Sequence, residues 1–289
     1  MNTTVQQIRS ELRYLVRELG LLDKNCLNSG LSLSQAHLMT YLHKNGQTSF
    51  SELGTQLNIE KASLSRTLNN LLNQALIHAY PEPTDKRQKR FELSTLGIER
   101  LGEADTAANE TLGRLIPQLS LNEAEEVISG LRALRLCAFR NNASIDPSRV
   151  QIEELTTSYK EDVLRLIHDT FAKEQAIPED LVPLSDDTPQ YWWVARSGEY
   201  ILGAAAGWYE NDEWHWGRFV VDPRFRHLGI GLKLASYSLH QLLTITDSIY
   251  IEARDITVSI VERLGGQIVG KPFDFYGMPV TPMRLARPN

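Results

Sequence analysis

The sequence contains few of the residues that mark disulfide-linked, metal-binding or membrane proteins. Only two of its 289 residues are cysteines, Cys26 and Cys137, and both lie in helical patterns of apolar residues, with no spacing typical of metal ligands. We therefore expect reduced core residues and no metal site. No apolar run is long enough to span a bilayer, and the first residues lack the apolar core of a signal peptide. These absences predict a cytoplasmic protein that does not bind membranes.

The composition is that of a globular protein, with 42% hydrophobic and 23% charged residues. The length exceeds that of a usual single core and suggests two domains. Residues 1–145 carry 16 Lys and Arg against 15 Asp and Glu, whereas residues 146–289 carry 14 against 21. Within residues 61–90, however, there are six basic residues and two acidic ones. A local basic patch of this kind can bind nucleic acid even in an acidic chain.

A polar stretch divides the two halves. Residues 141–148, Asn-Asn-Ala-Ser-Ile-Asp-Pro-Ser, are small and polar and include a proline, which is typical of a linker. We expect a first domain over residues 1–142, a linker over 143–148 and a second domain over 149–289.

The first half has the periodicity of a helical domain. Apolar residues or capping signals indicate helices in four segments: 5–27, 34–45, 49–57 and 60–74. Ser32 or Ser34 is expected to cap the second of them. A short helix, a turn at Asn58 and an amphipathic helix make up the layout of a helix-turn-helix.

The last of these helices has short polar and basic side chains on its outward face: Lys61, Ser63, Ser65, Arg66 and Asn69. Such side chains can bond base edges and phosphates, although a solvated helix face has the same composition. Two short strands follow, over residues 76–80 and 90–93, joined by a loop that contains Asp85, Lys86 and Arg87. A hairpin with a basic tip directly after a helix-turn-helix is a wing, which favours DNA binding.

In order and spacing this half resembles the MarR family of winged-helix regulators, over roughly residues 5–140. The matching residues are Ser65-Arg66 in the helix, Asp85-Lys86-Arg87 in the wing and Leu93-Ser94-Thr95-Leu96-Gly97 after it. The resemblance implies a homodimer held by the first helix and by later helices near 99–116 and 122–139. It also implies a pseudo-palindromic double-stranded operator. The recognition helix would enter the major groove, Lys86 and Arg87 would reach the minor groove, and a salt bridge from Asp85 would position Arg87.

The second half is organised around a strand, a turn and a helix. Residues 214–221 are aromatic and β-branched, as in a strand, and leucines at helical spacing begin at Leu232. Between them Gly229 and Gly231 let backbone N–H groups approach an anion at the positive end of the helix, and Arg224 and Arg226 add full charges. The alternative is an ordinary strand–helix connection, and a dinucleotide fingerprint lacks its third glycine here.

This turn resembles the acetyl-CoA signature of the GNAT acetyltransferases, Arg226-x-x-Gly229-x-Gly231 after a strand that ends in Phe219-Val220-Val221. The resemblance covers residues 149–287 and implies a mixed α/β sheet, with acetyl-CoA as the acetyl donor. In that family the strand diverges from its neighbour and bonds the pantetheine arm, which implies Phe219, Val220 and Val221. The pyrophosphate would be cradled by the turn: Arg226, His227, Leu228, Gly229, Ile230 and Gly231.

The chain departs from that family at the general acid. The tyrosine that commonly protonates the leaving thiolate is replaced by Val261, and the usual asparagine seven residues earlier by Arg254. Tyr276 and Tyr250 are weak substitutes. The candidate bases for the acceptor amine are Glu213 and His215, which alternate onto one face of the strand that enters the coenzyme site.

We therefore expect an N-terminal, mainly α winged helix-turn-helix domain and a C-terminal α/β GNAT domain. The expected function is bifunctional: a MarR-type transcription regulator and an N-acetyltransferase that acts on an amine, with a small molecule as the acceptor. The alternative is a regulator whose GNAT-like domain only senses an acyl-CoA or an amine. The long polar loop over residues 173–190 is expected to be a binding element.

Overall fold

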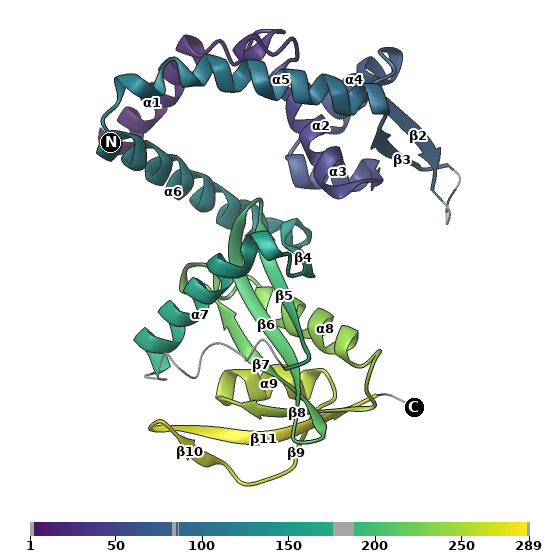
Figure 1. Ribbon diagram of the computed structural model, residues 1–289, viewed down its shortest axis with the longest axis vertical. Helices are drawn as coiled ribbons and strands as arrows, with labels where there is room; N and C mark the ends of the chain where they lie inside the picture. The colour runs from purple at the N-terminus through teal and green to yellow at the C-terminus, as the bar shows by residue number, and fades with distance from the viewer. Residues whose placement is uncertain (1–2, 83–84, 86, 176–187, 288–289) are drawn as a thin grey trace. The chain divides into compact units, whose positions relative to one another are not determined.

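The computed structural model describes residues 3–82, 85, 87–175 and 188–287 (Figure 1). The chain forms two compact units, Met1–Ala133 and Leu134–Asn289. Within the described ranges no helix is long and apolar enough to cross a membrane. Most of the predicted loop 173–190 lies outside the described residues, as does Lys86 of the wing.

The first unit is mainly helical and carries a small antiparallel sheet of order β1-β3-β2. Its elements are α1 (Thr3–Glu18), α2 (Leu33–Asn45), β1 (Thr48–Ser49), α3 (Phe50–Leu57), α4 (Lys61–Asn73), β2 (Ile77–Pro81), β3 (Lys89–Leu93), α5 (Thr95–Gly113) and the first part of α6 (Leu121–Ile145). The predicted helix-turn-helix is α3 and α4, and the predicted wing is β2 and β3 (Figure 1).

Local sequence signals position these helices. Ser32 and Gln35 form a reciprocal capping box at the start of α2, and Gly46 ends that helix with a φ of 66°. Ser49 caps α3, and Asn58 ends it in the left-handed conformation. Local residues therefore determine the turn between α3 and α4. The two helices pack around a shared core that includes Leu38, Leu42, Leu53, Leu64, Leu68 and Leu71.

The first helix is shorter than the sequence predicts. The apolar pattern continues to residue 27, but α1 ends at Glu18 and Gly20 has a φ of 61°. A left-handed glycine ends a helix readily because it has no Cβ to clash. No residue of α1 is buried, so its apolar side chains face outward in a single copy of the chain.

The second unit contains a mixed sheet of order β10-β11-β8-β7-β6-β5-β4, with β9 also paired to β11. Its strands are β4 (Gln151–Glu154), β5 (Gln190–Ser197), β6 (Tyr200–Glu210), β7 (Glu213–Val221), β8 (Ser248–Ala253), β9 (Gln267–Ile268), β10 (Phe273–Phe275) and β11 (Met278–Ala286). Each described pair is antiparallel except β7 and β8, which run parallel. Residues 267–275 thus contain two short strands, β9 and β10, which both pair with β11.

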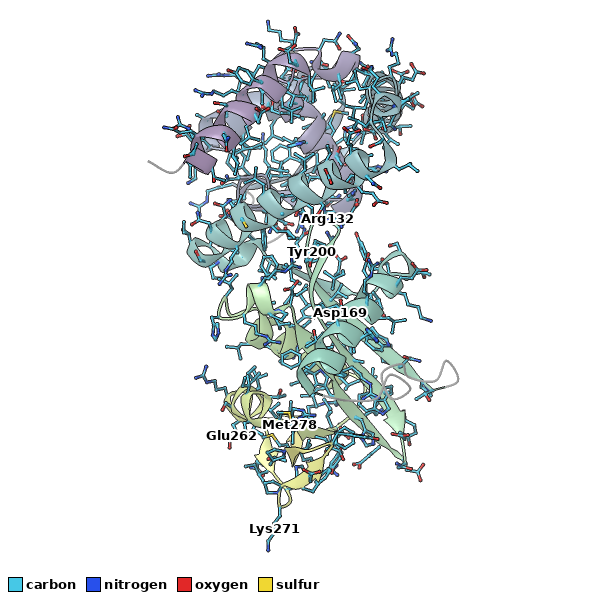
Figure 2. The ribbon with its side chains drawn as sticks, turned by 90° about the vertical axis from the view of Figure 1, so that its left-hand side faces the viewer. Arg132, Asp169, Tyr200, Glu262, Lys271 and Met278 are labelled. Atoms are coloured by element: carbon cyan, nitrogen blue, oxygen red, sulfur yellow. The ribbon has the colours of Figure 1, made fainter. Side chains whose placement is uncertain are left out.

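Helices cover both faces of this sheet. On one face, α8 (Ile230–Leu242) and α9 (Asp255–Arg263) contribute Leu234, Leu239 and Val261 to a core shared with Trp216 and Ile251. On the other, α7 (Lys160–Gln175) contributes Val163, Ile167 and Phe171 to a second cluster with Val194 and Val220. Asp169, labelled in Figure 2, lies on the exposed side of α7. The sheet therefore has an α8 face and an α7 face.

The predicted linker is more ordered than its composition suggests. Helix α6 extends from Leu121 to Ile145, into the predicted linker, and Pro147–Arg149 then forms a 3-10 turn. The division between the compact units falls earlier, inside α6, because Leu136, Phe139 and Ala143 pack into the core of the second unit. Ala143 is small, so the sequence does not distinguish a linker residue from a buried one. The fold does, because Ala143 packs against apolar residues that are distant in sequence.

Candidate functional site

The parallel strands β7 and β8 diverge partway along their length. Their ladder runs from Trp214↔Ile249 to Trp216↔Ile251 and ends there, although β7 continues to Val221 and β8 to Ala253. Backbone groups on the facing edges of the two strands need other partners beyond that point. The paired ladder thus ends before Phe219, Val220 and Val221, the segment that was expected to separate from its neighbour.

A bulge distorts β7 next to the point of divergence. The register between β6 and β7 shifts between Ala204 and Ala206, and Arg218 has a φ of 48°. One extra residue in a strand bends it and changes the side to which the following side chains point. Gly217 and Arg218 therefore both fall on the α7 face, whereas Phe219 packs into the core on the α8 face.

The two glycines of the turn have different surroundings. Gly229 precedes α8 with a φ of 73°, and a Cβ added there would meet nothing within 4 Å. A Cβ at Gly231 would meet the ring of Phe219 at 3.3 Å and Ile260 at 3.7 Å. Gly229 thus presents its backbone to open space, as an anion cradle requires, while Gly231 is needed for packing inside the domain.

The other predicted coenzyme residues lie around the same helix end. The guanidinium of Arg226 turns back to the end of β7, where its Nε donates to the carbonyl oxygen of Val221 at 3.3 Å. His227 has a φ of 66°, and Ile230 is the first residue of α8. The fold therefore gathers Arg226, His227, Leu228, Gly229, Ile230 and Gly231 beside the end of the strand Phe219–Val221.

An open groove of about 720 Å³ continues from this turn along α8. It is lined by Leu228, Gly229, Ile230, Lys233, Tyr237, His240, Arg263 and further residues, with Pro147 and Val150 at one side. Lys233 donates to the carbonyl oxygen of Val150 at 2.6 Å. Burial lowers the pKa of Lys233, and the charge of Asp146 opposes that shift. The lining is basic and apolar, which suits a phosphate-bearing ligand.

The two predicted bases lie in a polar cluster on the α7 face. Glu213 forms an ion pair with Arg284 of β11, at 2.7 Å between Oε2 and Nη2. The Arg284 guanidinium also lies over the Tyr250 ring, 5.7 Å from its centre. Glu213 is therefore already held by a cation that is 71 residues away in sequence.

His215 has a different environment in the same cluster. Its ring stacks on Trp208 at 5.5 Å and meets the Tyr250 ring edge-on at 5.4 Å. Its Nε2 lies 3.1 Å from the carbonyl oxygen of Glu210. Because a carbonyl oxygen only accepts, this contact places the proton of a neutral ring on Nε2 and leaves Nδ1 with a lone pair.

The residues at the positions of the usual acid and asparagine have clear surroundings. Val261 is fully buried in the core, so nothing at that position can supply a proton. Tyr276 is exposed at the turn between β10 and β11. Burial of Tyr250, with the charges of Glu252 and Glu213, raises the pKa of its phenol. Arg254 precedes α9, and its Nη1 and Nη2 atoms are buried without a hydrogen-bond partner.

Sequence reasoning does not find four residues of this cluster: Trp208, Glu210, Arg218 and Arg284. Their signal is weak because a strand residue's contacts depend on its partners across the sheet. Arg284 is paired in register with Tyr250, and Trp208 with His215. Only a known strand order brings them together.

The predicted DNA-contacting residues in α4 are all exposed: Lys61, Ser63, Ser65, Arg66 and Asn69. In the wing, Asp85 accepts hydrogen bonds from the backbone N–H and the Nε of Arg87, and the ion pair measures 3.2 Å. These bonds lower the pKa of Asp85. The side chain of Arg87 is 92% exposed, so its guanidinium faces solvent while Asp85 holds its backbone N–H and its Nε.

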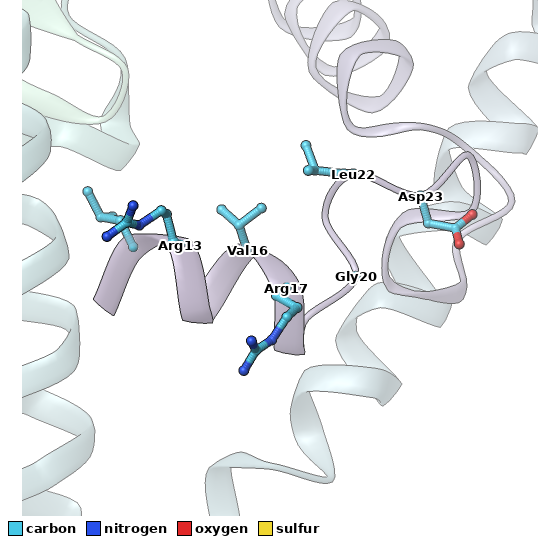
Figure 3. Close-up of a pocket in the computed structure, with 7 residues that line it drawn as sticks. Arg13, Val16, Arg17, Gly20, Leu22 and Asp23 are labelled. Carbon is cyan, nitrogen blue, oxygen red and sulfur yellow. The ribbon is translucent and has the colours of Figure 1, made fainter. Parts of the chain in front are cut away.

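The first unit also has a hollow between α1 and the turn that follows (Figure 3). Its volume is about 630 Å³, and its lining includes Leu12, Val16 and Leu22 together with Arg13, Arg17 and Asp23. Leu22 is 87% exposed. The hollow is largely apolar and belongs to the helix that buries none of its residues.

Two family models match the chain, one in each half. A model described as "MarR family" matches residues 29–88, and one described as "Acetyltransferase (GNAT) domain" matches residues 151–287. An uncharacterized HTH-type transcriptional regulator of Bacillus subtilis, YdgJ, is 24% identical over 129 residues, which are 45% of this chain and 77% of YdgJ.

Solved structures resemble each half separately. The crystal structure of Escherichia coli ElaA is 18% identical and has a TM-score of 0.43; the match covers 47% of this chain and 98% of ElaA. The apo form of Escherichia coli MarR is 19% identical with a TM-score of 0.37, over 43% of this chain and 95% of MarR. On the two family models and the fold, this chain joins a winged helix-turn-helix of the MarR family to an acetyltransferase domain of the GNAT family.

Proposed function

We propose that this protein is a dimeric DNA-binding regulator that also transfers an acetyl group from acetyl-CoA to the amine of a small molecule. The observation that carries the enzymatic part is the divergence of β7 and β8 beside the open backbone of Gly229. The MarR-family match and the exposed polar face of α4 support the DNA-binding part.

The residues around α8 fit the coenzyme. Gly229 offers its backbone without obstruction, and Arg226 provides a charge at the same helix end. The diverging edge of Phe219–Val221 provides backbone groups to an extended arm. When bound, the coenzyme supplies an acyl thioester, whose thiolate leaves when an amine attacks the carbonyl carbon.

We assign the general base to His215 and a positioning role to Glu213. A base must accept a proton from the amine, and the Nδ1 lone pair of His215 is available for that when Nε2 donates to the Glu210 carbonyl. The carboxylate of Glu213 is occupied by Arg284. Glu213 therefore holds Arg284 against the ring of Tyr250, which in turn contacts His215.

Tyr250 is the better of the two candidate acids. Like other tyrosines it carries its proton on Oη at neutral pH, so the phenol is in its donating form. It lies on β8 beside the last paired residues of the ladder, where the two strands begin to diverge. Tyr276 lies in an exposed turn with a φ of 51°, away from that ladder.

In the first unit, α4 would enter the major groove and Arg87 the minor groove, with Lys86 as a second wing contact. Asp85 pairs with the Nε of Arg87 and leaves the rest of the guanidinium exposed to a phosphate or a narrow groove. Dimerisation would cover the outward apolar residues of α1 and the first part of α6, which a monomer leaves exposed.

A second function is supported by one observation. Val261 removes the usual proton donor, which is compatible with a domain that binds an acyl-CoA or an amine only to sense it. The two functions differ in one measurable event, the release of free thiol.

The test is a thiol-release assay with acetyl-CoA over a panel of small amines, on the dimer with and without operator DNA. We expect release with at least one amine, and a fall in kcat of about 100-fold or more for His215→Gln, the usual contribution of a general base. The control is His168→Gln, which changes an exposed histidine of α7. Tight coenzyme binding without thiol release in the whole panel would favour the sensor.

A further inference from the structure

Arg254 is anomalous among the arginines of the second unit. Its Nη1 and Nη2 atoms are buried, and neither has a hydrogen-bond partner. By contrast, Arg196 is held by two hydrogen bonds to Glu153, at 2.5 and 2.8 Å, and Arg284 by Glu213 at 2.7 Å. A desolvated guanidinium without a partner is unfavourable, so its persistence calls for a group that satisfies it.

The position of Arg254 identifies the space that such a group would occupy. Continuing the register Trp216↔Ile251 along both strands would place Arg254 opposite Phe219, but the ladder has ended by then. Arg254 directly follows the last residue of β8, beyond the point where its pairing with β7 ends. Side chains alternate along β8, and Ile249, Ile251 and Ala253 are buried on the α8 face. The intervening positions, including Arg254, fall on the α7 face with Tyr250.

Among the residues that the structure describes, no carboxylate accepts a hydrogen bond from Nη1 or Nη2 of Arg254. Glu252, on the same face of β8, is exposed, and so is Asp255 on the first turn of α9. Burial lowers the pKa of Arg254, yet a guanidinium stays protonated at neutral pH. A second arginine, Arg218, lies at the bulge on the opposite strand and on the same face. The guanidinium of Arg218, however, lies over the ring of Trp208 in β6, 5.3 Å from its centre, and so on the side of β7 away from the gap.

We propose that Arg254 binds a carboxylate carried by one of the two substrates of acyl transfer, either the acyl group or the acceptor amine. The inference rests on the proposed function, because it takes the gap between β7 and β8 as the place of the thioester. In the proposed site Gly229 and Arg226 would hold the phosphates of the coenzyme, and its pantetheine arm is uncharged. A carboxylate on a substrate is the remaining anion that would reach a guanidinium beside this gap.

Calorimetry on the full chain distinguishes the two sources. The first arm compares CoA, acetyl-CoA and succinyl-CoA. The second compares free amino acids with their carboxamides in the presence of saturating CoA. Each ligand is measured on the wild type, on Arg254→Gln and on the control Arg165→Gln, which removes a charge from an exposed i,i+3 pair of α7.

Loss of a charge-assisted bond predicts a fall in affinity of about tenfold or more in Arg254→Gln, confined to the ligands that carry the carboxylate. A selective loss for succinyl-CoA assigns the carboxylate to the acyl group, and a selective loss for amino acids over amides assigns it to the acceptor. An equal loss for CoA, acetyl-CoA and succinyl-CoA would overturn the proposal in favour of a coenzyme contact. Unchanged affinities for all ligands would overturn it as well.

A second measurement does not depend on the choice of ligand. Arg254→Met removes an unpaired buried charge and keeps the volume, so it should raise the thermal midpoint of the ligand-free protein, while Arg165→Met should not. A lower midpoint for Arg254→Met would mean that the guanidinium is satisfied within the chain, and the proposal would fail. If CoA does not bind the wild type, the proposed function fails first and this inference falls with it.

Discussion

The two units of the chain leave different kinds of groups unsatisfied. In the first unit α1 buries none of its residues, and Leu22 and Leu121 are 87% and 86% exposed. In the second unit apolar side chains pack between the helices and both faces of the sheet, although Ile145 and Ile256 remain 78% and 79% exposed. Among its described side chains, both terminal nitrogens of Arg254 are buried without a hydrogen-bond partner. The first unit thus presents an exposed apolar helix face, and the second contains a buried guanidinium without a partner.

This difference has a physical origin. Apolar burial has no preferred direction and grows with area, at about 25 cal/mol per Å², so it suits contact between two copies of a helix. A buried guanidinium requires an anion at a defined position and angle, which suits a ligand that enters a slot. A substitution in one unit should therefore leave the binding property of the other unit unchanged.

The largest effect is expected at the outward face of α1. Leu12→Glu places a charge in the apolar hollow, and burying it in a dimer should raise the dissociation constant of the dimer by about 100-fold or more. Sedimentation equilibrium measures this change. The matched control Gln7→Glu adds the same charge to the same helix at an exposed polar position. A dimer that withstands Leu12→Glu would show that α1 is not the interface, whereas acetyl-CoA affinity should stay constant in both variants.

The next effect is expected at the coenzyme turn. Gly229→Asn keeps the left-handed conformation, which asparagine tolerates, but fills the open space where phosphates would bind. Acetyl-CoA affinity should fall about tenfold or more by calorimetry, from the loss of charge-assisted bonds. Gly277→Asn is the control, since Gly277 also has a positive φ and nothing within 4 Å of an added Cβ. Equal affinities in the two variants would remove the basis for the coenzyme site.

Gly231 is not a useful position for testing coenzyme binding, although the motif in the sequence does not distinguish it from Gly229. An added side chain there would meet Phe219 and Ile260 inside the domain. A bulky residue would disturb packing, and a loss of binding would not report on the coenzyme.

The smallest effect is expected in the wing. Arg87→Ala should weaken operator binding and flatten the dependence of log affinity on log salt by about 0.9 if one phosphate contact is lost. Asp85→Asn keeps the loop's hydrogen-bond acceptor and removes only the charge that holds Arg87. It should therefore weaken binding less than Arg87→Ala. Fluorescence anisotropy over a salt series measures both, and an unchanged slope in Arg87→Ala would exclude the phosphate contact.

Local signals made much of the fold predictable. The cap at Ser32, the turn at Asn58 and the glycine turn before α8 each depend on residues close in sequence, and each is present. The end of α1 was missed because the leucines after Gly20 keep a helical spacing although they are no longer helical. A pattern records which residues are apolar, not whether the backbone between them is continuous.

The candidate site was only partly predictable, for a different reason. The glycine turn is contiguous in sequence, whereas the partners of Glu213 and His215 come from β6, β8 and β11. The substitution of Arg254 for asparagine was visible in the sequence, but its lack of a partner was not. Whether Arg254 has a partner depends on which side chains the folded chain places next to it.

The course of α6 affects how this protein can be divided. The GNAT family model begins at residue 151, but the compact second unit begins at Leu134. A chain cut in the polar stretch 143–148 would lose Phe139, whose ring lies 6.2 Å from that of Phe225, and the bond from Arg135 to the carbonyl of Ser197. The segment that matches the family model is therefore shorter than the compact unit. Helix α6 supplies the difference, and a free-standing second unit made from this chain would have to keep the last turns of that helix.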